Sequence, residues 1–338
     1  MLLTRSRNLI FLFFAALIIT IFSCTEKSEE EEAEPPVSKP SIIRNVAVKT
    51  VNASNKMFRN PKFSEDGSKL IFSSTVSSGL WMLDLERDST FQLNDKIISA
   101  GDYTSDLSGD LVIFIHSSYD RQLRKRNFYI GKQSLGSDSV VNIYESEKRL
   151  NQLELTPDDN ITFFERDSLV ILNFSTGRMY DWGNKNINVL KATKGTIIEY
   201  SERNKKKYNV IQRGNVLWPQ YVDDSTILFN EAGKGTFLLN CITGSVEQIG
   251  NYNQPVYCRQ SRLIAFMREK SDGHTVTSSR IFVMNLGSNK AVPVDPENSY
   301  VEENPSWSPD GKELVYNTVE GKIQLARLEL NNLALMNN

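Results

Sequence analysis

One motif occurs near both ends of this sequence and constrains its fold more than composition does. Residues 60–72 are Asn-Pro-Lys-Phe-Ser-Glu-Asp-Gly-Ser-Lys-Leu-Ile-Phe, and residues 304–316 are Asn-Pro-Ser-Trp-Ser-Pro-Asp-Gly-Lys-Glu-Leu-Val-Tyr. Counted from the proline, both have an aromatic residue at +2, Asp at +5, Gly at +6 and an aromatic residue at +11. The matching residues are Pro61, Phe63, Asp66, Gly67 and Phe72 in the first copy, and Pro305, Trp307, Asp310, Gly311 and Tyr316 in the second. This shared spacing indicates an internal repeat.

Weaker copies of the motif lie between these two. Their starting positions are separated by 30 to 50 residues, and the mean separation is about 41. A period of about 40 residues is typical of a β-propeller, in which each blade is a sheet of four strands. The seven starting positions are Pro61, Tyr103, Leu153, Val189, Pro219, Pro255 and Pro305.

The residue types in one unit fit a blade. Proline cannot donate to a ladder and suits the entry of the innermost strand. Ser-Glu-Asp-Gly and Ser-Pro-Asp-Gly are turn sequences, so Asp66, Asp158 and Asp310 are expected in turns rather than as catalytic acids. Short apolar strands follow, and no helical periodicity of useful length interrupts them. The sequence therefore predicts an all-β fold.

The repeat Asn-Pro-x-aromatic-Ser-x-Asp-Gly, followed by two aliphatic residues and an aromatic one, resembles the WD-like repeat of TolB-type β-propellers. The resemblance is specific at 60–72 and 304–316 and loose in the five units between. It implies a propeller over about residues 42–330. TolB-type propellers are known for protein–protein contacts in the cell envelope, so the resemblance also implies an interaction module.

Ring closure can be predicted from the two ends of the domain. The last unit offers three strands, and Ile42–Val51 alternates as a strand would. Pairing this segment onto the last blade would close the ring and leave no open edge between first and last blades. We therefore expect residues 41–338 to form one domain, a monomeric propeller.

The blade count is the open point of this prediction. Seven blades are favoured and six remain the alternative, because the unit at 189–218 has only 30 residues. It can hold an entry strand and strands at 196–201, 208–213 and 215–218. Lys205-Lys206-Lys207 would then form a solvated hairpin tip.

The N-terminus has the pattern of an export signal. Arg5 and Arg7 precede an apolar run, Leu9–Phe22, whose 14 residues would span roughly 21 Å as a helix, short of the ~30 Å hydrocarbon core. The run ends in Ile21-Phe22-Ser23-Cys24, which resembles the bacterial lipobox through Ile21, Ser23 and Cys24. Residues 1–23 are thus expected to be a lipoprotein signal peptide, with Cys24 carrying palmitate-type acyl chains.

Residues 24–40 have the composition of a flexible tether. Six acidic residues and three prolines occur there, and no apolar cluster could nucleate a core. An acidic run behind a lipidated cysteine resembles the signal that sends some Gram-negative lipoproteins to the cell surface. We expect attachment to the outer membrane, exposed either at the surface or on the periplasmic face.

Charge and residue counts exclude several functions. Of 39 basic and 41 acidic residues, four and six lie before residue 41, which leaves 35 of each sign in the body. A neutral body lacks the electrostatic footprint of a nucleic-acid binder. His116 and His274 are the only histidines and cannot supply a multi-histidine metal site, so no metal or cofactor is expected.

The remaining candidate nucleophiles and loops favour ordinary structural roles. Cys241 and Cys258 are expected to be buried free thiols, although export would permit a disulfide between them. Gly233–Thr236 is expected to be a hairpin turn rather than a phosphate loop. Longer insertions are expected in the units with 50-residue spacing, where Arg121–Asn127 and Glu269–Ser279 are polar stretches between strands. Such loops are the places where function could lie.

Two functions follow from these patterns. The first is a lipid-tethered, non-catalytic propeller that binds a protein, peptide or glycan. The alternative is a glycan lyase or hydrolase that uses paired carboxylates at the channel mouth, which the sequence cannot place. The absence of a clustered set of titratable residues in the sequence favours binding, and no catalytic residue is assigned.

Overall fold

A computed structural model describes residues 43–51, 56–74, 79–156, 159–180, 188–201, 204–211, 214–272, 274–286, 290–296 and 300–330. The predicted signal peptide and tether, with Ile21, Ser23 and Cys24, lie outside these residues, as does Asp158. The described residues form 27 strands and no helix. No segment among them is therefore a helix long and apolar enough to cross a membrane.

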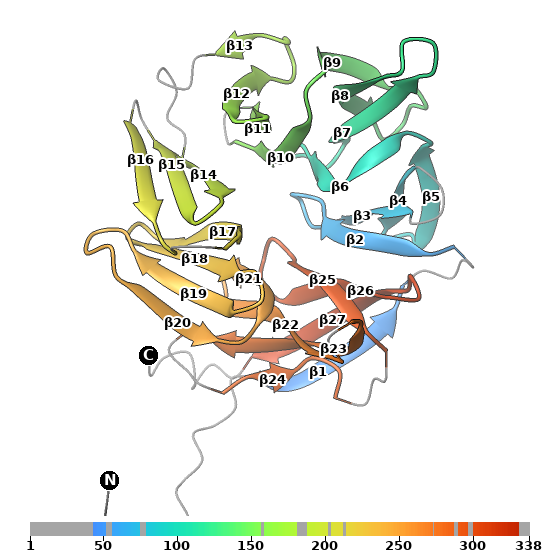
Figure 1. Cartoon of the computed structure of the whole chain (residues 1–338). Coiled ribbons are helices and arrows are strands. Elements are labelled where there is room, and N and C mark those ends of the chain that lie inside the picture. Colours follow the sequence, from blue (N-terminus) through green and yellow to red (C-terminus); the bar gives the residue numbers. More distant parts are fainter. Residues whose placement is uncertain are drawn as a thin grey trace, which may run out of the picture. The chain divides into compact units, whose positions relative to one another are not determined.

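The strands form seven small sheets arranged in a ring, which makes the domain a seven-bladed β-propeller (Figure 1). Within blades 1 to 3, consecutive strands pair antiparallel from the innermost strand outward. Blade 1 contains β2 (Phe58–Phe63), β3 (Lys69–Ser74), β4 (Leu80–Asp84) and β5 (Ser89–Asn94). Blade 2 contains β6 (Ile97–Ser105), β7 (Leu111–Asp120), β8 (Lys125–Ser134) and β9 (Val141–Ser146). Blade 3 contains β10 (Leu150–Leu155), β11 (Asn160–Glu165), β12 (Ser168–Asn173) and β13 (Met179–Tyr180).

The other four blades follow the same order, with two departures. Blade 4 has three strands, β14 (Asn188–Thr193), β15 (Thr196–Ser201) and β16 (Asn204–Asn209). Blade 5 contains β17 (Val216–Asp223), β18 (Thr226–Glu231), β19 (Gly235–Asn240) and β20 (Val246–Gly250). Blade 6 contains β21 (Asn253–Cys258), β22 (Leu263–Ser271), β23 (Val276–Asn285) and β24 (Val292–Pro293). Blade 7 contains β25 (Glu302–Trp307), β26 (Glu313–Thr318), β27 (Ile323–Leu330) and β1 (Ile43–Thr50).

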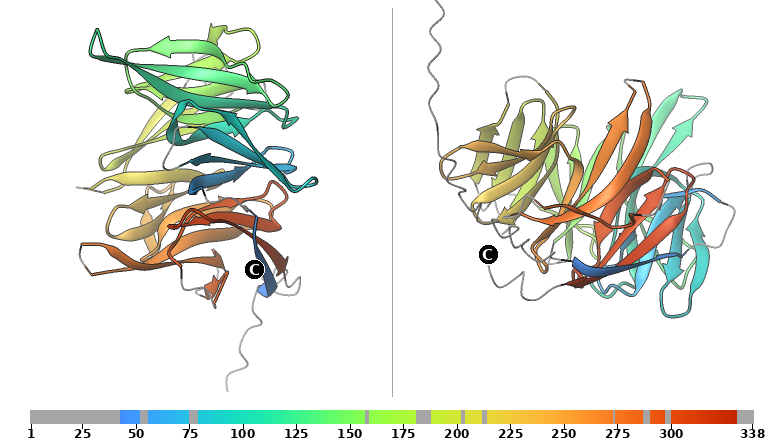
Figure 2. Two further views of the ribbon diagram at one scale, coloured as in Figure 1. Left: turned by 90° about the vertical axis from the view of Figure 1, so that its right-hand side faces the viewer. Right: turned by 90° about the horizontal axis from the view of Figure 1, so that it is seen from below.

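Strand β1 closes the ring, as the sequence predicted. It pairs antiparallel with β27, from Ile43 opposite Leu330 to Thr50 opposite Gln324. Figure 2 shows β1 lying alongside the strands of the last blade. The prediction of seven blades is confirmed and the six-blade alternative is wrong.

The strand assignment within blade 4 is the main correction. The third strand begins at Asn204 rather than Tyr208, and residues 216–218 belong to β17 of the next blade. Lys205-Lys206-Lys207 therefore lies within β16 and does not form a hairpin tip. Lysine has a low strand propensity, but the pairing of β16 with β15 outweighs this local preference.

The core consists of seven apolar clusters, one between each pair of neighbouring blades. The cluster between the last and first blades contains Phe58 and Phe72 of blade 1 together with Val315 and Leu325 of blade 7. An open row of seven blades would have only six such interfaces. The seventh cluster therefore shows that the ring is closed by side-chain packing as well as by β1.

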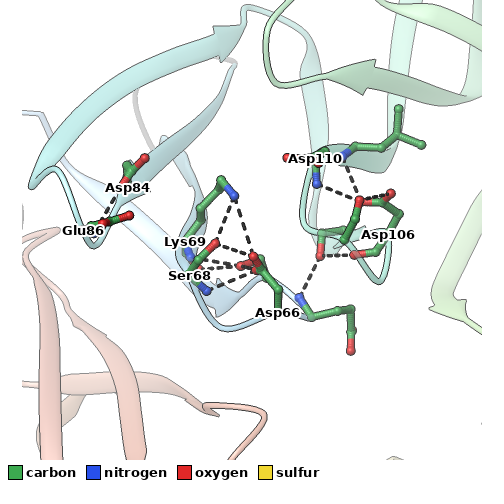
Figure 3. A network of polar contacts seen from close by, with 12 residues as sticks. Asp66, Ser68, Lys69, Asp84, Glu86, Asp106 and Asp110 are labelled. Carbon is green, nitrogen blue, oxygen red and sulfur yellow. Dashed lines mark hydrogen bonds and ion pairs between the residues drawn. The ribbon is translucent and has the colours of Figure 1, made fainter.

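The repeat motif forms the turn between the first two strands of a blade. In blade 7, Asp310 Oδ1 accepts hydrogen bonds from Ser308 Oγ at 2.7 Å and from the Lys312 backbone N–H at 3.1 Å. Asp66 makes the equivalent contacts in blade 1, and Figure 3 shows them beside the related turn of Asp106 in blade 2. Phe72 and Tyr316, at +11, are fully buried in the second strands. The motif therefore fixes a turn and an interface residue.

Candidate functional site: an axial pocket

The innermost strands carry a repeated irregularity that faces the centre of the ring. Six of the seven, all except β14, shift register through a β-bulge. Five of these bulges hold a non-glycine residue in the left-handed region, with φ between 45° and 56°: Asn60, Gln152, Trp218, Gln254 and Asn304. Such a conformation costs about 1 kcal/mol or more per residue and is commonly found at functional positions. The bulges are therefore the first structural sign of a site on the axis.

A cavity of about 850 Å³ lies at these bulges. Its lining residues come from the innermost strands of all seven blades, together with Arg166 and Asp167 of the turn between β11 and β12. Pockets of this size accommodate a small ligand or a short segment of a chain. The axial position makes this cavity the candidate functional site, which we call the axial pocket.

Two side chains of the axial pocket are available to a ligand. Trp218 keeps 41% of its surface exposed although it is one of the largest apolar residues in the chain. Arg166 is exposed, and no hydrogen bond or ion pair joins its guanidinium to another described residue. An indole face can stack on a flat apolar group, and a guanidinium can bind a carboxylate or a carbonyl.

Amide side chains form one wall of the axial pocket across three blades. Gln254 Nε2 donates to Asn304 Oδ1 at 3.0 Å, and Asn304 Nδ2 donates to Asn317 Oδ1 at 3.0 Å. Asn317 Oδ1 also accepts from the Asn60 backbone N–H at 3.1 Å. These bonds hold the amides in fixed orientations, so the wall presents defined donors and acceptors.

The two lysines that line the axial pocket are paired with oxygen atoms of the protein. Lys191, whose side chain is 7% exposed, donates to Asp167 Oδ1 and to the Arg166 carbonyl oxygen, both at 3.0 Å. Lys62 donates to the carbonyl oxygens of Gly101 and Tyr103 in the next blade. Burial lowers the pKa of Lys62 although neighbouring carboxylates oppose this. These lysines therefore position neighbouring blades. Among the described residues that line the axial pocket, only Arg166 offers an unpaired cation.

Two carboxylates near the axis differ in their surroundings. Asp102 Oδ1 accepts the Gln152 backbone N–H at 3.0 Å and so joins blades 2 and 3. Glu154 lies one position beyond the repeat start on β10, and part of its surface is exposed. The protein atoms around its carboxyl group nevertheless desolvate it, and this desolvation raises its pKa to about 7. The positive charge of Lys62 opposes this shift. Desolvation thus moves the pKa of Glu154 toward the range of a general acid or base.

The two histidines lie away from the axial pocket. His116 is within β7 and is 5% exposed; its Nε2 lies 2.8 Å from Asn142 Oδ1, and burial lowers its pKa. His274 lies at the tip of the β22–β23 hairpin. Among the described residues, no three His, Cys, Asp or Glu side chains gather as metal ligands.

The other sequence candidates also fall outside the axial pocket. Cys241 and Cys258 are both free thiols, and Cys258 is buried as expected, whereas Cys241 is half-buried. Gly233–Thr236 spans the turn between β18 and β19 and the start of β19. Arg121–Asn127 and Glu269–Ser279 form the tips of two long hairpins, β7–β8 and β22–β23, rather than irregular insertions.

Sequence reasoning missed the residues that line the axial pocket. Asn60 and Asn304 were visible as the residues before Pro61 and Pro305, and asparagine tolerates the left-handed conformation. That signal could have suggested a bulge. Trp218 carries the same signal, because it directly precedes the repeat start Pro219. Nothing in the sequence distinguished Arg166 from other exposed residues.

The class defined by this fold is the seven-bladed β-propeller. No protein-family model matches the sequence, and no curated protein matches it. Among solved structures, one chain in a crystal structure of the Mitotic Checkpoint Complex is 10% identical, with 91% of this chain and 99% of that chain covered and a TM-score of 0.58. This similarity concerns the fold alone.

Two further solved structures are similar to this chain at lower TM-scores. The putative TolB from Agrobacterium tumefaciens is 15% identical, with 86% of this chain and 100% of that chain covered and a TM-score of 0.49. An oligogalacturonate lyase in complex with manganese is 13% identical, with 81% and 77% covered and a TM-score of 0.42. A fold does not by itself define an activity.

Proposed function

We propose that this propeller is a non-catalytic binding module whose axial pocket holds a glycan or a peptide segment. The observation that carries the proposal is the exposed indole of Trp218, held in a left-handed bulge at a cavity lined by all seven blades. A sugar ring or a proline or aromatic side chain can stack on this indole. The oriented amides then match hydroxyl or peptide groups, and Arg166 matches an anionic or carbonyl oxygen.

The test is binding to immobilised glycans and peptides by the folded protein. Trp218→Ala should weaken binding of the recovered ligand about 30-fold, since losing a central aromatic contact costs about 2 kcal/mol. Ile242→Ser is a matched control, because Ile242 is 82% exposed and does not line the axial pocket. Arg166→Ala should also weaken binding, whereas Arg121→Ala on the β7–β8 tip should not. Equal binding by Trp218→Ala and the parent protein would refute the proposal.

A second candidate function is glycan cleavage, which the raised pKa of Glu154 favours. A carboxyl group that titrates near pH 7 can act as a general acid or base. Asp167 is paired with Lys191, and Asp102 accepts a backbone N–H, so neither is a free partner for Glu154. Binding therefore remains the main proposal. Mass spectrometry of oligosaccharides incubated with the protein would support cleavage if products form and Glu154→Gln abolishes them.

We further propose that the domain is exported and anchored by acyl chains on Cys24, at the outer membrane. The support is the apolar run Leu9–Phe22 and the Ile21-Phe22-Ser23-Cys24 sequence. Cys24→Ala should abolish incorporation of labelled fatty acid and release the protein from the membrane fraction. Cys241→Ala removes a different cysteine and should leave both properties unchanged. Unaltered labelling of Cys24→Ala would contradict the anchor.

A further inference from the structure

Blade 4 differs from the other blades at its outer edge. Each of the other six sheets has four strands, whereas the sheet of blade 4 has the order β14-β15-β16. Among the described residues, no strand pairs with the outer edge of β16. An edge strand of this kind presents main-chain donors and acceptors that another strand can use.

The register identifies which backbone groups of β16 point outward. Val210 donates its N–H to the Gly195 carbonyl oxygen at 3.1 Å, which marks a hydrogen-bonded pair at the end of the β15–β16 ladder. Hydrogen-bonded pairs alternate along an antiparallel ladder, so Tyr208 and Lys206 also bond to β15. The N–H and C=O groups of Lys205 and Lys207 consequently point away from β15.

The exposed edge of β16 is strongly basic. Residues Asn204–Lys207 are all exposed, and no ion pair neutralises Lys205, Lys206 or Lys207 among the described residues. Lys206 Nζ instead donates to the Cys241 carbonyl oxygen at 3.0 Å, and Lys205 Nζ lies 5.1 Å from the centre of the Tyr200 ring. Three adjacent positive charges on a strand edge disfavour pairing with a second, identical edge.

The same fold already accepts an outer strand from outside a blade. Strand β1 is far from blade 7 in sequence, yet it completes that sheet by antiparallel pairing with β27. Among the described residues, no strand pairs with β16 at the fourth position of blade 4. A partner strand at β16 would therefore repeat an arrangement that the propeller uses elsewhere.

We propose that the outer edge of β16 is a docking site for an extended, acidic segment of a partner polypeptide, which adds as the fourth strand of blade 4. Main-chain hydrogen bonds to Lys205 and Lys207 provide attachment, and carboxylates at alternate positions of the partner face the lysines. Main-chain pairing thus provides the affinity, and the lysine side chains provide the preference for an acidic partner. This surface is separate from the axial pocket and does not depend on its ligand.

The experiment measures binding of a labelled peptide, Thr-Glu-Val-Glu-Thr-Glu-Val, to the full-length protein by fluorescence anisotropy. A second peptide with Lys in place of every Glu is the charge control. The acidic peptide should bind at least tenfold more tightly than the basic one, and added salt should weaken it. Trp218→Ala should bind the acidic peptide normally, because that substitution affects only the axial pocket.

Matched variants at Lys207 separate backbone pairing from charge. Lys207→Pro removes an outward N–H that β15 does not use, so β16 should remain folded while peptide binding falls at least tenfold. Lys207→Ala keeps the N–H and removes the same charge, and it should lose only about threefold. As a measurement independent of folding, an acidic peptide N-methylated at its backbone should not bind the parent protein.

Three results would overturn the inference. Equal binding of the N-methylated peptide would show attraction by charge without strand addition. Equal binding of the basic and the acidic peptide would show that the edge of β16 does not select an acidic partner. Concentration-dependent dimerisation that Lys207→Pro abolishes, without peptide binding, would assign the edge to a second copy of this chain.

Discussion

Two glycines at the same place in the repeat have different surroundings. Gly67 and Gly311 both end the Asp-Gly turn with positive φ, 76° and 71°. A Cβ on Gly67 would come no closer than 3.5 Å to its nearest neighbour, Pro309. A Cβ on Gly311 would lie 2.7 Å from Cys258 Sγ and 3.2 Å from the Ser261 backbone nitrogen. One turn therefore tolerates a side chain sterically and the other does not.

This difference gives a paired prediction for stability. Gly67→Ala should reduce the free energy of unfolding by about 1 kcal/mol, the cost of a left-handed alanine. Gly311→Ala should reduce it by about 1–3 kcal/mol more, because Cys258 is buried and cannot move freely. Urea denaturation of both variants measures the two losses. Equal losses would mean that the contact with Cys258 does not constrain this turn.

Glu154 predicts a pH dependence of stability. Its pKa rises to about 7 in the folded protein, whereas an unfolded glutamate titrates near 4.5. Between about pH 4.5 and pH 7 the folded state therefore binds more protons than the unfolded state. The free energy of unfolding is consequently highest below about pH 4.5 and decreases as the pH rises through 7. Because Glu154 is exposed, we expect a change of about 1 kcal/mol rather than the several expected for a fully buried group.

Glu154→Gln removes the titration and should flatten this part of the profile. Thermal melts of the parent and the variant at pH 5 and pH 8 give the comparison, and the variant should gain stability mainly at pH 8. A profile that is the same in both proteins would show that Glu154 titrates normally.

The residue pattern predicted the structural positions better than the functional ones. The Asp66 and Asp310 turns and the buried Phe72 and Tyr316 recur at fixed spacing, because every blade needs a turn and an interface. The axial pocket arises instead where six inner strands bulge, and its side chains differ from blade to blade. The position of Trp218 was predictable, because it precedes the repeat start Pro219 as Asn60 precedes Pro61. The exposure of its indole at a cavity was not predictable, because it depends on packing around the axis.

At the scale of elements, β1 is the strand whose loss should matter most. Val51 donates its N–H to the Ile323 carbonyl oxygen at 3.0 Å, and the alternation along this ladder places the Ala47 N–H in a bond to β27. Ala47 itself is exposed. A proline there would act through the backbone alone.

Ala47→Pro should therefore destabilise the ring by at least about 2 kcal/mol, through one lost ladder bond and the strain around it. Ala47→Ser retains the N–H and should change stability by less than about 0.5 kcal/mol. Chemical denaturation gives both values. A proline variant as stable as the serine variant would mean that β1 contributes little to closure.

The strands of blade 4 show why element boundaries were harder to predict than the blade count. The period of about 41 residues placed seven units correctly, and the alternation of Ile42–Val51 predicted the closing strand. Three consecutive lysines suggested a turn, but cross-strand pairing from Tyr200 with Lys205 to Ile198 with Lys207 places them in β16. Pairing with a neighbouring strand outweighed local composition.

For the whole molecule, the packing between blades that closes the ring also positions the residues of the axial pocket. Seven apolar clusters between neighbouring blades hold the inner strands around the axis, and side chains such as Lys62 and Asp102 join one blade to the next there. A pocket built in this way is preorganised, so a ligand loses little affinity to reordering of the protein. The neutral body adds no long-range attraction, and recognition should depend on contacts inside the axial pocket.

The location of the bound ligand tests this account most directly. A crystal structure of the protein with a ligand recovered from the glycan and peptide arrays should place that ligand on the propeller axis, stacked on Trp218 and within hydrogen-bond distance of Arg166 or the amides of Gln254 and Asn304. A ligand seated on the outer strands or the hairpin tips, with the axial pocket empty, would contradict it.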